Sequence, residues 1–372
     1  GSAGRAGSPG PAPAAFLAKT APRAAAQIAL LLQQTYAYSH DSGPAFNRGS
    51  KPATVISFPV QVQGAPWLRL EFADVVLSGD FFAVMELNEV TLRQWQNTTA
   101  YFNGDTVIVE IEAHPGTGVN QVVMKTVWAG IGVMPESQCG PSDDRVPSSD
   151  PRSARLLPIG CTGWLIDDCA GCFITAGHCT GGALQVVQFN VPLSTGSGQT
   201  QNPPVSDQYT VDNSSVQTNG GQGIGNDYAY FGAFANASTG KTAAAAQGST
   251  FVLSPPPAFN PSQNIRITGY GTDNSPAQWN QIQQTHAGPW VTSSGTLVQY
   301  RADTTGGNSG SPVIHDPTGL AIGVHAHGGC QTSGAGQNSG TLIIHSGLQN
   351  YLNNPKGVCL GGLSEAQPMP SQ

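Results

Sequence analysis

About one residue in five of this 372-residue chain is a glycine or a proline, with 47 glycines and 28 prolines. Both residue types interrupt helices and are common in turns between short strands. Charged residues make up only 10 % of the chain, whereas helical bundles and coiled coils are rich in Glu, Lys and Arg. The sequence therefore predicts an all-β protein in which many turns join short strands.

The charge and hydropathy patterns argue against two classes of partner. Acidic side chains outnumber basic ones by 22 to 15, which gives a net charge of −7, so we expect no nucleic-acid binding. The apolar stretch at residues 24–32 is shorter than the roughly 20 apolar residues that span a bilayer, and it lacks the layout of a signal peptide. We therefore expect no membrane insertion, and the sequence does not indicate an oligomeric state.

The first 133 residues divide into a leader and a strand-rich region. Residues 1–50 are rich in Ala, Gly, Pro and Ser, which predicts a loose leader or arm with one helix around Ala24–Tyr36. Residues 51–133 contain three segments with strand-like patterns, at 67–72, 106–112 and 122–128. These strands predict a small antiparallel β-sandwich, an accessory region in which we find no catalytic constellation.

A proline-rich stretch at residues 134–157 has the composition of a linker between two domains. Three of its basic residues are expected in exposed chain, where a protease could cut: Arg145, Arg152 and Arg155. Strand-like segments and Gly-rich turns resume over residues 158–355 and end in a short helix predicted at Ser346–Leu352. Residues 356–372 are predicted to form a C-terminal tail.

Three short segments of the second half carry side chains that could do chemistry. His178 stands beside a cysteine, Asp227 opens a strand-like run, and Ser309 lies among glycines. Each alone has a structural interpretation, as a core histidine, a turn residue and a flexible loop. A serine flanked by glycines, however, is accessible to substrate, and backbone N–H groups there can approach a developing oxyanion. The order His, Asp, Ser within one strand-rich domain indicates a catalytic triad.

The segments around these residues resemble the chymotrypsin-like serine peptidases. Thr-Ala-Gly-His-Cys at 175–179 is similar to the Thr-Ala-Ala-His-Cys of that family, and Gly-Asn-Ser-Gly at 307–310 to its Gly-Asp-Ser-Gly. The strands at 161–166 and 267–271 resemble two further family segments. The resemblance covers residues 158–355 and implies a chymotrypsin-like double β-barrel that follows the small antiparallel sandwich.

The resemblance assigns a role to each group. It implies that Ser309 attacks the peptide carbonyl to form an acyl-enzyme, that His178 acts as general base and acid, and that Asp227 orients the imidazole. It also implies that the N–H groups of Gly307 and Ser309 form the oxyanion hole. The expected substrates are proteins or peptides, and no cofactor is expected.

One departure from animal trypsins concerns activation. Asn308 stands where trypsins carry the aspartate that pairs with a newly cut N-terminal amine, and no Ile-Val-Gly-Gly segment precedes Cys161. We therefore expect no activation by that ion pair, and cleavage between Arg145 and Val146 is a weaker alternative. The runs at 306–312 and 322–325 resemble the bacterial glutamyl endopeptidase branch instead.

The substrate pocket implied by the resemblance has conflicting features. Asp303 stands where trypsins place the acid that selects Arg or Lys, whereas Thr304 and His325 stand where glutamyl endopeptidases hold a glutamate carboxylate. Gly328 and Gly340 would leave the pocket open in both cases. We expect Asp303 to turn away and Glu or Asp to be preferred before the scissile bond. The alternatives are trypsin-like specificity and a catalytically silent binding protein with this fold.

Seven cysteines suggest either disulfides or a metal site, at positions 139, 161, 169, 172, 179, 330 and 359. The resemblance implies a Cys161–Cys179 disulfide beside the catalytic histidine. Cys169 and Cys172 are close enough in sequence to pair within one loop, and the other partners stay open. Zinc held by cysteines and by His325 and His327 is the alternative, but oxidised thiols cannot bind metal, so we expect no metal. Two or more disulfides predict a secreted, extracellular protein.

Overall fold

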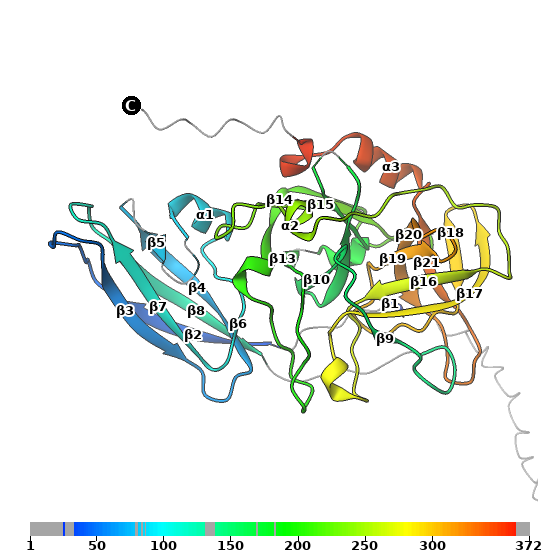
Figure 1. The fold of residues 1–372 in the computed structure, drawn as a ribbon, viewed down its shortest axis with the longest axis horizontal. Helices are drawn as coiled ribbons and strands as arrows, with labels where there is room; N and C mark the ends of the chain where they lie inside the picture. The colour runs from blue at the N-terminus through cyan, green and yellow to red at the C-terminus, as the bar shows by residue number, and fades with distance from the viewer. Residues whose placement is uncertain are drawn as a thin grey trace, which may run out of the picture.

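The computed structural model describes residues 25–26, 33–78, 81–82, 85, 87–130, 138–168, 170–181 and 184–361. Strands dominate this part of the chain. Figure 1 shows an N-terminal sandwich at one end, a second barrel at the other, and the first barrel between them. No helix among the described residues is long and apolar enough to cross a membrane.

The N-terminal unit consists of two antiparallel sheets, with strand orders β2-β8-β4-β6 and β3-β7-β5. Leu68, Leu70 and Phe72 alternate along β4 and are all buried, as the pattern predicts. The predicted strands at 67–72, 106–112 and 122–128 are parts of β4, β7 and β8. The elements are β2 (Gln33–Asp41), β3 (Ala53–Gln61), β4 (Trp67–Val76), β5 (Phe81–Phe82), α1 (Glu89–Gln94), β6 (Phe102–Asn103), β7 (Thr106–Ala113) and β8 (Gln121–Gly130).

The predicted helix around Ala24–Tyr36 is wrong over the residues that the structure describes. Ala25–Ala26 forms the short strand β1, and β2 begins at Gln33 and pairs along β8. Alanine favours a helix locally, but the tyrosines of β2, Tyr36 and Tyr38, pack against the sandwich core. Tertiary packing and the pairing with β8 therefore override helix propensity, and the sandwich extends N-terminally of residue 51.

The second half of the chain folds into two closed antiparallel barrels. The first has the order β10-β11-β12-β15-β14-β13. Its core contains Trp164, Phe173 and Phe231, and the rings of Phe173 and Phe231 stack with centroids 5.2 Å apart. Its strands are β10 (Ser153–Pro158), β11 (Cys161–Leu165), β12 (Phe173–Thr175), β13 (Leu184–Gln188), β14 (Gln208–Thr218) and β15 (Ala229–Ala233). The helix α2 (Ala243–Gln247) lies in the connection to the second barrel.

The second barrel has the order β20-β19-β16-β17-β18-β21 and is closed by the pairing of β20 with β21. Two further strands join it, β1 on β20 and β9 (Val146–Pro147) on β17. The predicted double β-barrel is therefore confirmed, and α3 (Ser346–Asn353) is the predicted C-terminal helix. The strands are β16 (Asn264–Gly269), β17 (Gln284–Ser294), β18 (Leu297–Tyr300), β19 (Pro312–His315), β20 (Leu320–Gly328) and β21 (Asn338–Leu342).

The stretch predicted as a linker packs against both barrels where it is described. Arg145 and Arg155 are 3 % and 0 % exposed and Arg152 is half-buried, so the expectation that they lie in exposed chain is wrong for Arg145 and Arg155. Arg155 belongs to β10 and donates hydrogen bonds to Gln188 and Asn202. Prolines and arginines are typical of surface chain. Here the guanidinium groups of Arg145 and Arg155 can be buried because polar partners satisfy their hydrogen bonds.

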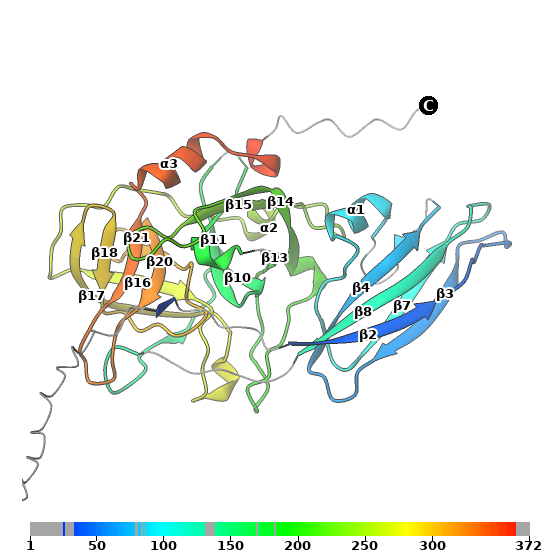
Figure 2. The ribbon, with the colours of Figure 1, turned by 180° about the vertical axis from the view of Figure 1, so that it is seen from behind.

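The sandwich and the first barrel share one hydrophobic core, because Leu157 and Val186 of the barrel belong to the sandwich cluster. The side chain of Arg69 crosses from the sandwich to Gln185, and the backbone of Tyr101 exchanges two hydrogen bonds with Gln208. In both views α1 lies on the side of the sandwich that faces the first barrel (Figure 1 and Figure 2). The two units are therefore packed together over a continuous contact.

Disulfides join segments of the chain from Cys139 onward, two of them over more than 180 residues of sequence. Among the described residues they are Cys139–Cys330, Cys161–Cys179 and Cys172–Cys359. The suggested pairing of Cys169 with Cys172 is wrong, because Cys172 is bonded to Cys359; Cys169 lies outside the described residues. Spacing in sequence favoured the short loop, but the fold places Cys359 next to the end of the first barrel.

Candidate active site

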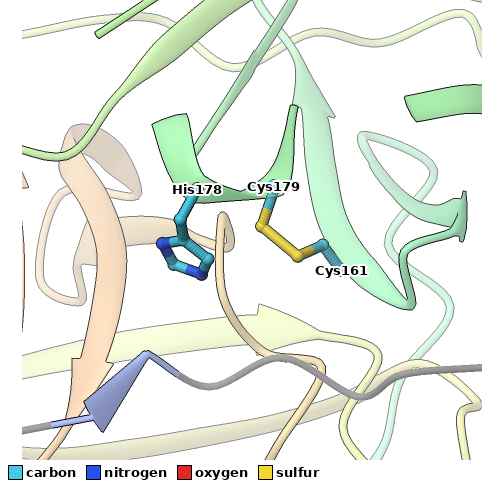
Figure 3. Close-up of side chains that lie close together, drawn as sticks. All are labelled: Cys161, His178 and Cys179. Atoms are coloured by element: carbon cyan, nitrogen blue, oxygen red, sulfur yellow. A yellow bond between two sulfur atoms is a disulfide. The ribbon is translucent and has the colours of Figure 1, made fainter. Parts of the chain in front are cut away.

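The turn that carries His178 follows directly on strand β12 of the first barrel. Residues Gly177–Cys179 form a single 3-10 turn, and the neighbouring Cys179 is bonded to Cys161 at the start of β11. Figure 3 shows the disulfide beside the imidazole, and a ring nitrogen of His178 lies within 4.8 Å of both sulfurs. The disulfide therefore fixes the backbone on one side of the histidine.

The carboxylate of Asp227 makes two contacts with the same histidine. Its Oδ2 lies 2.6 Å from Nδ1 of His178, and its Oδ1 accepts a hydrogen bond from the His178 backbone N–H at 3.1 Å. Asp227 is 1 % exposed, and its own N–H donates to Oγ1 of Thr341 in the second barrel. The ring is thereby held with the Nδ1 proton toward the carboxylate, and Nε2 has no hydrogen-bond partner among the described residues.

Ser309 lies on the loop between β18 and β19, on the second barrel. Its carbonyl accepts a hydrogen bond from the N–H of Thr162 at 2.9 Å and lies 3.6 Å from Sγ of Cys179. The structure therefore brings Ser309 to the turn that carries His178. The hydroxyl of Ser309 donates to the carbonyl of Ala326 at 3.3 Å rather than to the imidazole, and in free enzymes this contact with the base often forms only when substrate binds.

The backbone around Gly307 is held by two hydrogen bonds to its carbonyl groups. The carbonyl of Gly306 accepts from the N–H of Thr272 at 2.7 Å, and that of Gly307 from Oγ1 of Thr162 at 2.9 Å. Gly307 has φ +105°, a conformation that L side chains rarely adopt. Within the described residues, the N–H groups of Gly307 and Ser309 donate no hydrogen bond, so both are available to an oxyanion.

Asp303 faces the segment that precedes the first barrel. Its Oδ1 accepts from the N–H of Cys139 at 2.7 Å and its Oδ2 from the N–H of Asp144 at 2.8 Å, and Nδ1 of His286 lies 3.3 Å away. Both carboxylate oxygens of Asp303 therefore accept hydrogen bonds from the segment around residues 139–144.

Thr304 and His325, the two other polar positions expected to contact substrate, lie at the same end of the second barrel. His325 is opposite Gly340 in the pairing of β20 with β21, and its Nδ1 lies 2.6 Å from the hydroxyl of Tyr300. Burial, with His327 and His178 nearby, lowers the pKa of His325 to about 3. The imidazole is therefore neutral at ordinary pH, and the hydroxyl of Tyr300, whose pKa burial raises, is protonated.

Asn338 is one residue of this region that the sequence did not single out. Its Nδ2 donates to Oγ1 of Thr304 and its Oδ1 accepts from the N–H of Gly329. Asn338 therefore connects the segment of Thr304 with the one that follows Gly328. No local motif announces it, because its partners come from two distant loops.

His327 is a neighbour of the His178–Asp227 pair that the sequence did not indicate. Its Nε2 lies 3.8 Å from Oδ2 of Asp227, and its ring centroid is 6.1 Å from that of His178. Burial lowers the pKa of His327, although Asp227 acts in the opposite direction. Its spacing from His325 gave only the zinc alternative, and neither histidine belongs to a cluster of potential metal ligands among the described residues.

Two clusters of potential metal ligands occur among the described residues. In the first, Cys161 and Cys179 flank His178, but both sulfurs are oxidised in one disulfide. In the second, Asp144, His286 and Asp303 approach within 4.8 Å. There the Asp303 carboxylate accepts two backbone N–H groups, and Nδ1 of His286 accepts the N–H of Asp303. The two sulfurs of the first cluster are therefore not free to bind a metal, whereas in the second cluster Asp303 and Nδ1 of His286 take part in hydrogen bonds within the chain.

Two closed six-stranded barrels, with a histidine–aspartate pair on one and a glycine-flanked serine on the other, form a chymotrypsin-like double β-barrel. Residues 161–324 match the family model described as a trypsin-like peptidase domain. The matched residues lie within the double barrel, which the accessory β-sandwich precedes.

Parts of the chain are similar to other known proteins. Over 92 residues the chain is 36 % identical to a protein named glutamyl endopeptidase from Staphylococcus aureus, a match that covers 24 % of this chain. The chain spans about a quarter (23 %) of the length of that relative. A Glu endopeptidase structure in complex with MPD has a TM-score of 0.44 at 20 % identity and covers 58 % of this chain and 97 % of its own. Human heparin binding protein has a TM-score of 0.41 at 18 % identity, with 57 % and 98 % covered.

Proposed function

We propose that the protein is a secreted serine endopeptidase that hydrolyses peptide bonds through His178, Asp227 and Ser309. The observation that carries the proposal is the 2.6 Å contact between Nδ1 of His178 and Oδ2 of Asp227, which leaves Nε2 unpaired beside the serine loop. Three disulfides among the described residues support an oxidising, extracellular location.

The proposed reaction follows from the position of each group. Oγ of Ser309 attacks the substrate carbonyl while Nε2 of His178 takes its proton, and the N–H groups of Gly307 and Ser309 stabilise the oxyanion. The imidazolium, stabilised by Asp227, gives the proton to the leaving amine, and the acyl-enzyme forms. A water molecule then repeats the sequence and releases the acid.

The pairing of β1 supports the binding of an extended peptide along β20. Ala25 pairs antiparallel with Gly328 and Ala26 with His327, whose ring is close to that of His178. Addition of a strand to a sheet edge supplies main-chain hydrogen bonds to any peptide sequence. A substrate bound in this manner would take the place of β1 and lie beside the catalytic groups.

A fluorophosphonate probe tests the proposed chemistry directly. We expect stoichiometric labelling at Ser309 in the folded protein and none after denaturation, because the hydroxyl is nucleophilic only beside a general base. Mass spectrometry of the labelled peptide locates the modification. Absence of labelling in a protein that unfolds cooperatively would favour the alternative, a catalytically silent binding protein with this fold.

We further propose a preference for Glu or Asp before the scissile bond. Asp303 is engaged by two backbone N–H groups, so it is not free to bind a cationic side chain. Neutral His325 and the hydroxyl of Thr304 are hydrogen-bond donors suited to a carboxylate. The relative named glutamyl endopeptidase supports the same preference.

Paired peptides that differ only in Glu against Gln test this preference. We expect His325→Gln to lower kcat/KM for the Glu peptide about 10- to 100-fold and to leave the Gln peptide within about twofold, because a hydrogen bond to a charged group contributes roughly 1.5–3 kcal/mol. The control is His315→Gln, at the histidine that ends β19 and contacts Thr318 and Gln263. Cleavage after Arg or Lys that is lost in Asp303→Ser and kept in His325→Gln would instead assign trypsin-like specificity.

A further inference from the structure

A buried arginine lies beside the serine loop although it is distant from it in sequence. The side chain of Arg145 is 1 % exposed. Its Nε and Nη2 bind the carboxylate of Asp143, its Nη2 also donates to the carbonyl of Thr272 at 3.0 Å, and its Nη1 donates to Oγ1 of Thr305 at 2.7 Å. The catalytic scheme above uses none of these contacts.

The partners of Arg145 lead in two steps to the oxyanion hole. The carbonyl of Thr272 is held by Arg145 and by the hydroxyl of Thr305. The N–H of the same Thr272 donates to the carbonyl of Gly306 at 2.7 Å. Because a peptide group is planar and trans, fixing the carbonyl of Gly306 also fixes the direction of the N–H of Gly307.

The guanidinium of Arg145 packs closely against the backbone at Gly271. A Cβ at position 271 would lie 2.2 Å from Nη1 of Arg145 and 2.3 Å from Nδ2 of Asn308, so only glycine fits there. Asn308 itself donates through its backbone N–H and its side chain to the carbonyl of Thr305. The guanidinium therefore contacts the serine loop through Thr305.

We infer that Arg145 is a positioning residue that holds the oxyanion hole in its working geometry through Thr272 and Thr305. The inference rests on the proposed peptidase function and deepens it. An internal cation, supplied by the segment before the first barrel, thus holds the serine loop through Oγ1 of Thr305 and the carbonyl of Thr272.

Further contacts keep this segment attached to the second barrel. Cys139 is bonded to Cys330, and the carboxylate of Asp303 accepts the N–H groups of Cys139 and Asp144. The strand β9 pairs with β17 directly after Arg145. These links give Asp303 a role other than substrate recognition, as an anchor for the arginine-bearing segment.

Substitution of Arg145 separates positioning from binding. We expect Arg145→Met to lower kcat about 10²- to 10³-fold, the loss typical of one missing oxyanion donor, with KM within about twofold. A peptide boronic acid forms a tetrahedral adduct in which Oγ of Ser309 bonds to boron and its proton passes to His178. Its affinity should fall in parallel with kcat/KM, while a cleaved product peptide binds as before, and Arg145→Lys should recover part of kcat.

The matched control is Arg152→Met. Arg152 forms the same i, i−2 pair with an aspartate, Asp150, but its guanidinium lies over the ring of Phe251 and contacts no part of the serine loop. We expect the kcat of Arg152→Met to stay within about twofold of that of the unsubstituted protein, because Arg152 does not contact the serine loop.

The outcomes are separable from those of the proposed function. An unsubstituted protein that neither cleaves peptides nor reacts with fluorophosphonate contradicts the peptidase function itself. If that protein is active, an unchanged kcat or an unchanged boronate affinity in Arg145→Met overturns the positioning role. Should Arg145→Met not fold, Thr305→Val removes the intermediate hydroxyl and keeps the arginine paired with Asp143; it must show the same fall in kcat and boronate affinity, and a normal kcat there also overturns the role.

Discussion

Replacing Ser309 or His178 by alanine is expected to lower kcat by about four to six powers of ten, and the double variant should cost little more than either single change. The nucleophile and the base act as one unit, so removing one already removes most of what the other contributes. The residual rate would come from the oxyanion hole and substrate binding. Single-turnover kinetics on a chromogenic peptide, with folding checked by circular dichroism, measures the loss.

A nearby serine provides the matched control for this experiment. Ser311 is also fully buried and lies two residues further along the same loop, but its hydroxyl has no hydrogen-bond partner among the described residues. We expect Ser311→Ala to keep kcat within a few-fold. Losses that multiply in the Ser309 and His178 double variant, or a comparable loss in Ser311→Ala, would contradict the assigned triad.

The barrels and the candidate triad were accessible from sequence because their signals are local. Alternating apolar residues indicate a strand, as at Leu68, Leu70 and Phe72. The motifs around Ser309 and His178 each occupy only a few consecutive residues. Each such segment requires its own residue types whatever the rest of the chain does. Their meeting at one site follows from the fold that the resemblance implied.

What the sequence could not predict depends on contacts between distant segments. Cys172 bonds to Cys359, 187 residues away, and spacing carries no information about such a partner. Arg145 was expected in an exposed linker, because a charged residue is rarely buried unless it is paired, and its partners are not visible in the sequence. The partners here are a nearby aspartate and backbone and hydroxyl groups supplied by two distant loops. The alanine-rich start likewise favoured a helix where the strand β2 begins, because the pairing with β8 that decides its conformation is not visible in the local sequence.

Arg69 shows the same limit at the junction between the sandwich and the first barrel. It lies between Leu68 and Leu70 in the alternating strand β4, yet it is 2 % exposed. Its guanidinium donates to the carbonyl of Thr99, to Oγ1 of Thr98 and to Oε1 of Gln185 in the barrel. Removing this side chain would leave three acceptors without their donor in a region closed to water.

We therefore expect Arg69→Met to lower the free energy of unfolding by about 3–5 kcal/mol, the loss typical of breaking a buried charged network on one side. The sandwich and the first barrel share a core through Leu157 and Val186, so urea unfolding should remain a single transition, with loss of peptidase activity at the same midpoint. Arg93→Met, at an exposed arginine paired with Glu89, should change the free energy by at most about 0.5 kcal/mol. If Arg69→Met instead shifts only an early transition and peptidase activity persists beyond it, the sandwich is an independently folding module and the shared core does not couple the two units.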